Sequence, residues 1–289
     1  MSLAIRPLIV GFMSACVWVA TANTSWADTA SPRGGAVSTA LCADAYLLAL
    51  AEPETITALS WQSRQSVSAA PDWARLLPQA SASAEALLML DPELVVFGPG
   101  DGARTQALLE RTGYQTASLL WGEDFDTVRA NYRLLGEALD RPEVARRQIA
   151  ALDQRLQALA DRAENRQRAP RIAYLSSSGG SAGAGTFVDA AIRAAGGINV
   201  IAEGGAAGWT RSDPEYALTL EADILLTSFF VDGFEGRFDR ARHHAAYARL
   251  LEAPHRMDIP SGDWPCAGPR LINAAERIAD AIDAWSEEP

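Results

Sequence analysis

The stretch SASAEALLMLDPELVVFG (residues 81–98) indicates the fold class of this 289-residue chain. Its first half carries leucine and alanine at helical spacing, with Glu85 in the first turn. Its second half is a short apolar run, rich in β-branched residues, that ends at a glycine and is typical of a buried strand. The same order returns in DPEYALTLEADILLTS (213–228), with Glu215 in the first turn. The chain therefore contains two helix-then-strand units that echo one another.

Outside these units, apolar runs and helical patterns alternate along the chain. Runs typical of strands lie at 36–39, 56–60, 115–120, 171–176 and 256–259, and helical patterns lie at 42–51, 103–112, 186–195, 243–251 and 269–285. Such alternation is typical of parallel sheets with helices on their faces.

Residues 124–168 break the alternation, because two helical patterns follow one another there with no strand between them. Pro142 suits the first turn of the second helix. A coiled-coil seam is the alternative, but the heptads are few. The predicted fold class is α/β, with two Rossmann-like lobes of mostly parallel sheets joined by one long α-helix. We predict an N-terminal lobe at 36–139, the connecting helix at 140–168 and a C-terminal lobe at 169–289.

The N-terminus has the pattern of a secretory signal peptide over residues 1–27. Arg6 precedes an apolar run from Leu8 to Ala22, and small residues precede a cleavage point near Ala27. A membrane anchor is the alternative, but the run is short for a span. The predicted mature chain is periplasmic, in a compartment that permits disulfides. Its formal charge, −11 for the whole chain, argues against a nucleic-acid partner.

Aromatic residues cluster where predicted strands end. In open α/β sheets, ligands bind outside the carboxyl ends of the strands. The candidate ligand-binding residues at these positions, together with one tryptophan in a separate glycine-rich loop, are Trp61, Arg64, Trp121, Trp209, Phe229 and Trp264. Tryptophans at loop mouths suggest apolar walls for a large flat ligand, and the alternative is that they close the ends of the lobes.

Two cysteines remain once the predicted leader is removed, and each lies at a strand-to-helix junction of one lobe. Cys42 and Cys266 allow three interpretations: a disulfide between the lobes, paired thiolates that bind a soft metal, or two buried thiols. We favour the disulfide and predict no metal site.

Catalytic patterns are weak. Ser177 and Ser178 allow a secreted serine hydrolase as an alternative, but no GxSxG motif surrounds them. GGSAGAG (179–185) does not have the dinucleotide-binding order and is expected to be a flexible loop. His243 and His244 fit a helix surface. We predict no catalytic residue and no cofactor, so the chain is expected not to be an enzyme.

These features together resemble a known family, the periplasmic solute-binding proteins of the iron-siderophore, haem and cobalamin ABC transporters. Besides the two echoing stretches, the resemblance is carried by TFVDAAIRAAGGINVIAE (186–203) and DWPCAGPRLINAAERIADAI (263–282), and it extends over nearly the whole mature chain. Leu41-Cys42-Ala43-Asp44 departs from the family's usual first turn, so no ligand contact is carried over there.

The resemblance implies a monomeric bilobed protein that captures a metal chelate between its lobes and delivers it to an inner-membrane ABC permease. In that family a glutamate on each lobe docks to permease arginines, and the matching positions are Glu85 and Glu215. The alternative for both is a first-turn residue favoured by the helix dipole.

The predicted ligand is a corrinoid such as cobalamin. Ferric catecholates would call for several convergent arginines, whereas the strand ends offer little beyond Arg64. Haem would call for an axial histidine or tyrosine, and none follows a predicted strand. A ferric siderophore or another metallophore is the alternative ligand.

Overall fold

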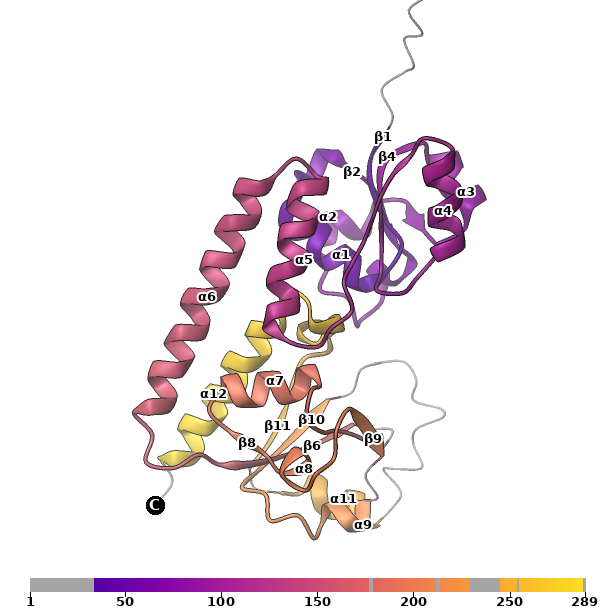
Figure 1. Ribbon diagram of the computed structural model, residues 1–289. Helices are drawn as coiled ribbons and strands as arrows, with labels where there is room; N and C mark the ends of the chain where they lie inside the picture. The colour runs from indigo at the N-terminus through magenta and orange to yellow at the C-terminus, as the bar shows by residue number, and fades with distance from the viewer. Residues whose placement is uncertain (1–33, 177–178, 212–213, 229–244, 254, 288–289) are drawn as a thin grey trace, which may run out of the picture. The chain divides into compact units, whose positions relative to one another are not determined.

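The first sheet contains five parallel strands in the order β3-β2-β1-β4-β5. The computed structural model describes residues 34–176, 179–211, 214–228, 245–253 and 255–287, which Figure 1 shows in colour. The strands are β1 (Gly34–Ser38), β2 (Ile56–Ser60), β3 (Gln79–Ala80), β4 (Pro92–Phe97) and β5 (Gln115–Ser118). Because all of them are parallel, their carboxyl ends share one edge of the sheet.

Helices cover both faces of this sheet, because alternate side chains of the central strands point in opposite directions. Val37 and Val95 share a buried cluster with leucines of α3 (Ala84–Leu90) and α4 (Ala103–Arg111). Residues of opposite parity, such as Val96, lie in the core that contains α1 (Leu41–Leu50). A short helix, α2 (Asp72–Arg75), lies in the connection from β2 to β3.

The second sheet contains four parallel strands in the order β11-β10-β6-β8. They are β6 (Arg171–Ser176), β8 (Ile198–Asn199), β10 (Ile224–Ser228) and β11 (Arg256–Asp258). Two helices, α7 (Phe187–Ala194) and α12 (Leu271–Ser286), pack on one face, and α8 (Val200–Glu203) and α11 (Ala245–Leu251) pack on the other. One further short helix, α9 (Pro214–Ala217), precedes β10. The predicted α/β class, with mostly parallel sheets in two halves, is confirmed.

The glycine-rich stretch 179–185 is partly a strand, which corrects its prediction as a loop. Residues Gly180–Ala182 form β7, which pairs antiparallel with β9 (Trp209–Arg211). Ser181 and Ala182 are buried in this pairing. Small side chains allow the close approach, and the distant partner strand supplies the backbone hydrogen bonds, so local sequence does not indicate the strand.

Two helices follow one another between the sheets, as the helical patterns predict. They are α5 (Phe125–Ala138) and α6 (Pro142–Glu164), and Pro142 occupies the first turn of α6. The long helix is thus shorter than the predicted 140–168, and the predicted domain boundaries stay a prediction. Among the described residues, no helix is both long enough and apolar enough to cross a membrane.

Arginines of α6 and of the residues directly after it bind the C-terminal helix α12. Arg155 pairs with Glu276 at 2.5 Å, and Arg162 pairs with Asp283 at the same distance. The side chain of Arg166 is buried, pairs with Asp283 at 2.7 Å and donates to the carbonyl oxygen of Ala195. The charged face of α6 therefore joins it to the second half of the chain rather than to solvent alone.

One hydrophobic core contains residues from both halves. It includes Tyr46 and Leu47 of α1 and Leu135 of α5, together with Ile192 of α7 and Ile278 of α12. A core shared in this way resists separation of the halves, because separation would expose apolar side chains to water.

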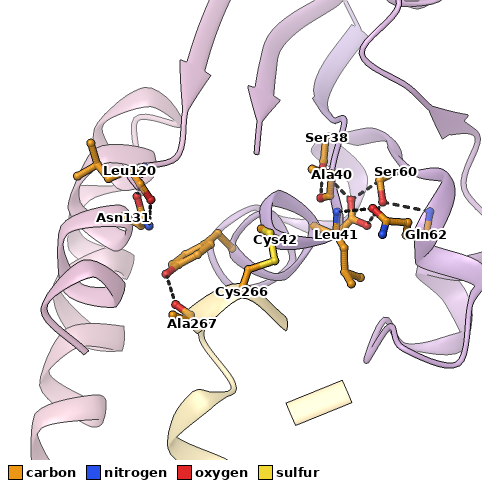
Figure 2. Close-up of a disulfide and its surroundings, with 12 residues drawn as sticks. Ser38, Ala40, Leu41, Cys42, Ser60, Gln62, Leu120, Asn131, Cys266 and Ala267 are labelled. Carbon is orange, nitrogen blue, oxygen red and sulfur yellow. Dashed lines mark hydrogen bonds between the residues drawn. A yellow bond between two sulfur atoms is a disulfide. The ribbon is translucent and has the colours of Figure 1, made fainter. Parts of the chain in front are cut away.

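Asp44 joins the first helix to the ends of two strands. The side chain is buried, and its carboxylate accepts hydrogen bonds from Ser38 Oγ at 2.6 Å, Ser60 N at 2.8 Å and Ser60 Oγ at 2.6 Å. Figure 2 shows Ser38 and Ser60 facing one another beside the start of α1. Burial raises the pKa of Asp44 above its ordinary value, and the hydrogen bonds from Ser38 and Ser60 partly offset this effect.

We expect Asp44→Ala to lower the free energy of unfolding by about 2–4 kcal/mol, because three buried donors lose their acceptor. Asp44→Asn keeps an acceptor and should cost less at pH 7. Since the pKa is raised in the folded state, the stabilisation is complete below the ordinary pKa and is lost as pH rises through the raised one. The wild type should therefore gain stability relative to Asp44→Asn as pH falls. Urea unfolding at pH 7.5 and pH 4.5 measures both effects, and equal midpoints for the Ala and Asn variants would contradict the first.

Candidate functional site

Two tryptophans lie exposed at the carboxyl edge of the first sheet. Trp61 begins a 3-10 helix, η2 (Trp61–Arg64), directly after β2, and 54% of its surface is exposed. Trp121 follows β5 and is 79% exposed. Indoles this accessible do not close the end of a core, so the structure disfavours that alternative for both. They are free to contact a ligand.

Small residues occupy the sheet edge between these tryptophans. The strands β1 and β4 lie between β2 and β5, so the ends of β2 and β5, which precede the two tryptophans, are roughly 14 Å apart at ordinary strand spacing. A Cβ added to Gly98, which follows β4, would lie 2.7 Å from the Cβ of Ala40, which follows β1. Small residues therefore follow the two central strands, between the strands that the tryptophans follow.

Arg64 donates hydrogen bonds within the connection from β2 to β3, to which it belongs. Its Nε donates to the carbonyl oxygen of Arg75 at 2.9 Å, and its Nη2 donates to that of Leu77 at 3.0 Å. Part of the guanidinium's donor capacity is thus used within the connection from β2 to β3. A ligand contact by Arg64 stays a prediction.

Trp209 lies on strand β9 and not in a loop as predicted. It is 46% exposed, and its ring packs edge-on against Phe187, with the ring centroids 4.9 Å apart. The ring of Tyr174, in β6, also packs edge-on against Trp209, with the ring centroids 6.4 Å apart. The indole is held at the rim of an aromatic cluster with nearly half of its surface accessible.

Trp264 is fully buried, which corrects its prediction as a ligand-binding residue. It lies between two short 3-10 helices, η3 (Ser261–Asp263) and η4 (Pro265–Ala267), which turn the indole into the core beside Tyr174 and Phe187. Burial raises the pKa of Tyr174, so this phenol is neutral. Trp264 therefore supports the cluster that carries Trp209. Phe229, the remaining aromatic candidate, lies outside the described residues.

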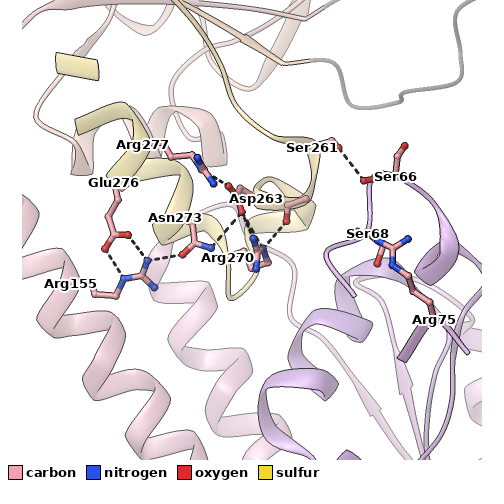
Figure 3. Close-up of polar contacts among 11 residues, drawn as sticks. Ser66, Ser68, Arg75, Arg155, Ser261, Asp263, Arg270, Asn273, Glu276 and Arg277 are labelled. Carbon is pink, nitrogen blue, oxygen red and sulfur yellow. Dashed lines mark hydrogen bonds and ion pairs between the residues drawn. The ribbon is translucent and has the colours of Figure 1, made fainter. Parts of the chain in front are cut away.

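Asp263 is a buried charge at the end of the second sheet. Its carboxylate pairs with Arg270 at 2.7 Å and with Arg277 at 2.8 Å, as Figure 3 shows. Two arginines from the C-terminal helix region thus neutralise it. The two arginines compensate the buried carboxylate.

Glu123 belongs to the candidate site, although the sequence analysis missed it. It follows Trp121 and Gly122, and its carboxylate accepts hydrogen bonds from Trp209 Nε1 and from the backbone N–H of Phe187. The signal in the sequence was its position two residues after Trp121, in the segment that follows a predicted strand. Its partners lie 64 and 86 residues further along the chain, so the pairing itself could not be read from the sequence.

Cys42 and Cys266 form a disulfide, with their Cα atoms 5.4 Å apart (Figure 2). Tyr46 Oη donates to the carbonyl oxygen of Ala267 at 3.3 Å, one residue beyond the bond. Both sulfur atoms are bonded to one another, so paired thiolates for a metal do not describe this structure. Among the described residues, no group of three or more His, Cys, Asp or Glu side chains is placed to hold a metal ion.

The two glutamates with a predicted docking role are both exposed on short helices. Glu85 lies in the first turn of α3, and Glu215 lies in the first turn of α9. Exposed apolar side chains accompany each: Met89 beside Glu85 on α3, and Tyr216 next to Glu215. The docking role stays a prediction. Ser177, Ser178, His243 and His244 lie outside the described residues.

Two parallel α/β sheets linked through α6, with exposed tryptophans at strand ends, define the class of bilobed α/β binding proteins. The chain belongs to the periplasmic binding protein family, whose family model matches residues 37–230. The predicted resemblance is thereby confirmed.

Curated relatives include cobalamin-binding proteins from two strains of Halobacterium salinarum. Each is 26% identical to this chain over 207 residues, a match that covers 68% of this chain and 55% of the relative. The chain therefore spans about half the length of the curated relatives it matches.

Solved structures share the fold. The apo form of the periplasmic haem-binding protein RhuT from Roseiflexus sp. RS-1 matches with a TM-score of 0.71 and 22% identity, covering 88% of this chain and 100% of that one. The periplasmic vitamin B12 binding protein BtuF of Vibrio cholerae matches with a TM-score of 0.67 and 19% identity, covering 89% and 99%. At these identities the matches establish the fold alone.

Proposed function

We propose that this protein is the periplasmic substrate-binding component of an ABC importer and that its ligand is a corrinoid such as cobalamin. The observation that supports this ligand most is the pair of exposed indoles, Trp61 and Trp121, in the segments that follow β2 and β5 at one edge of the first sheet. Accessible indoles at one sheet edge suit a broad, flat and weakly charged macrocycle.

The charges and side chains at the strand ends support a corrinoid over the other chelates. Arg270 and Arg277 pair with Asp263, and Arg64 is partly engaged with backbone carbonyls, so each of these arginines already has a partner within the protein, whereas a ferric catecholate calls for several convergent free cations. The described loops that follow the strands contain no histidine or tyrosine to serve as an axial ligand for haem. The curated relatives are named cobalamin-binding proteins, which agrees with this choice.

Titration of the purified protein with cyanocobalamin, haem and a panel of ferric siderophores tests the ligand. We expect saturable binding of cyanocobalamin at micromolar protein. Binding of a siderophore or of haem alone would replace the corrinoid assignment, and absence of any binding would reject the chelate-carrier function.

Replacing Trp61 or Trp121 by alanine should raise the Kd for cyanocobalamin by about tenfold or more, because an aromatic anchor of a binding site typically contributes well over 1 kcal/mol. The matched control is Trp285→Ala, at the end of α12, where the ring lies under Arg168 and beside residues that precede β10 and β11, not at the carboxyl ends of these strands. Isothermal titration calorimetry measures the Kd values, and melting curves verify folding. A control that weakens binding as much as the two variants would contradict the proposed site.

A further inference from the structure

Glu123 connects the loop after β5 with two elements of the second half of the chain. Both of its carboxylate oxygens lie 2.9 Å from Trp209 Nε1, and Oε2 also lies 3.1 Å from the backbone N of Phe187. Trp209 belongs to β9, and Phe187 is the first residue of α7. One side chain from before α6 thus accepts hydrogen bonds from two elements after it.

The chain around Glu123 holds it in place. Asp124 caps the next helix, α5, by accepting hydrogen bonds from Thr127 N at 2.7 Å and Thr127 Oγ1 at 2.8 Å. On the other side, a Cβ added to Gly122 would lie 2.0 Å from Thr127 Oγ1, so this close turn requires glycine. Glu123 therefore lies between a tight turn and the capped start of a helix, and its side chain is half-buried.

A carboxylate suits this position better than any neutral side chain of its size. Both partners, the indole N–H and the amide N–H at the start of α7, are donors, and a carboxylate only accepts. The amide at a helix N-terminus also favours a negative charge. A glutamine would direct an NH2 group toward one of the two donors.

We propose that Glu123 is a positioning residue, which fixes the indole of Trp209 at the ligand-facing rim and thereby slows ligand release. The effect on ligand release rests on the proposed function, whereas the effect on the orientation of Trp209 does not. Contacts within the protein set the orientation of Trp209. Tyr174 and Phe187 support the ring from behind, and Glu123 sets its rotation by binding the indole N–H.

The indole N–H of Trp209 reports on this contact without any ligand. In 15N–1H spectra, the cross-peak of Trp209 is identified by its loss in Trp209→Phe. We expect Glu123→Ala to shift this peak toward the position of a solvent-exposed indole and to speed its hydrogen exchange by about tenfold or more, since the N–H loses a charged acceptor. In Glu123→Gln, the peak position and the exchange rate should lie between those of the wild type and those of Glu123→Ala. The matched control is Asp126→Ala, which removes a carboxylate paired with Arg129 in the same segment. An unchanged Trp209 peak in Glu123→Ala would overturn the proposal.

The second measurement is the dissociation rate of cyanocobalamin by stopped flow. Glu123→Ala and Trp209→Phe should each raise this rate several-fold, and the double variant should raise it no further than the larger single effect, because both remove the same bond. Additive effects, or an unchanged rate, would overturn the role in ligand release. If the wild type fails to bind cyanocobalamin, the ligand assignment fails, while the spectra still decide whether Glu123 orients Trp209.

Discussion

Reduction of the Cys42–Cys266 disulfide will lower the thermal stability of this protein strongly. The bond closes a loop with a sequence separation of 224 residues. In the chain-entropy model, removal of so long a cross-link costs about 5 kcal/mol of unfolding free energy, which for a chain of this size corresponds to roughly 10–20 °C in Tm. The effect should be near the upper end for a single disulfide, because the loop contains most of the described chain.

The position of the bond adds a local reason for a large effect. Cys266 and Ala267 both have positive φ, 56° and 45°, a region that residues other than glycine rarely adopt. The disulfide to α1 and the hydrogen bond from Tyr46 hold this turn. Figure 3 shows a nearby contact between the same two halves, in which Ser261 Oγ donates to the carbonyl oxygen of Ser66 at 3.2 Å. Without the covalent link, such weak polar contacts and the shared core alone hold the turn against α1.

Differential scanning calorimetry with and without a reductant measures this loss. The control is the double variant Cys42→Ser/Cys266→Ser, whose Tm should match that of the reduced wild type and should not respond to the reductant. Thiol counting in the unfolded protein verifies that the bond was present and then reduced. A wild-type Tm that stays the same after complete reduction would contradict the stabilising role.

If Glu85 and Glu215 dock to the permease as we predict, reversal of both charges should abolish uptake of the ligand and leave its binding intact. Glu85→Arg and Glu215→Arg would each place a cation against the permease arginines that the family resemblance implies, and like charges brought together at an interface cost several kcal/mol. The double variant should therefore fail to deliver ligand. Its affinity for cyanocobalamin should not change, because neither residue lies at a described strand end.

Glu143→Arg provides the matched control for this prediction. Glu143 also lies in the first turn of a helix, α6, and is exposed, so its reversal makes the charge change of either single variant and removes a favourable helix-dipole contact in the same way. Uptake by cells or by vesicles with the permease should remain normal in this variant. Normal uptake with Glu85→Arg/Glu215→Arg, or a loss of ligand affinity, would contradict the docking assignment.

The secondary structure was largely accessible from the sequence, because its signals are local. The apolar run at 171–176 and the strand β6 have the same bounds, and the pattern at 84–90 coincides with α3. In contrast, the antiparallel pair of β7 and β9 escaped prediction. Both strands are only three residues long, β7 consists of small residues, and each strand is stabilised by a partner far along the chain.

The candidate site was accessible only in part. Trp61 and Trp121 are exposed at strand ends, where the sequence analysis placed them, and Trp209 is half exposed on a strand instead of a loop. Trp264 has the same sequence context as Trp61, an apolar strand followed by a loop, yet its indole is buried. Periodicity and turn residues do not distinguish these two cases, since burial depends on which other elements pack against the loop.

The sequence by itself determined the α/β class with two halves around a long helix, because hydrophobic periodicity and the echoing helix-strand units depend on residues close together in the chain. Its motifs also carried the resemblance to the family. Only the tertiary structure decided that Trp264 belongs to the core, that Asp44 joins α1 to two strands, and that Glu123 holds Trp209. It also paired Cys42 with Cys266. These features depend on contacts between residues far apart in the chain, and the free energy of such contacts is set by packing and desolvation that no local pattern encodes.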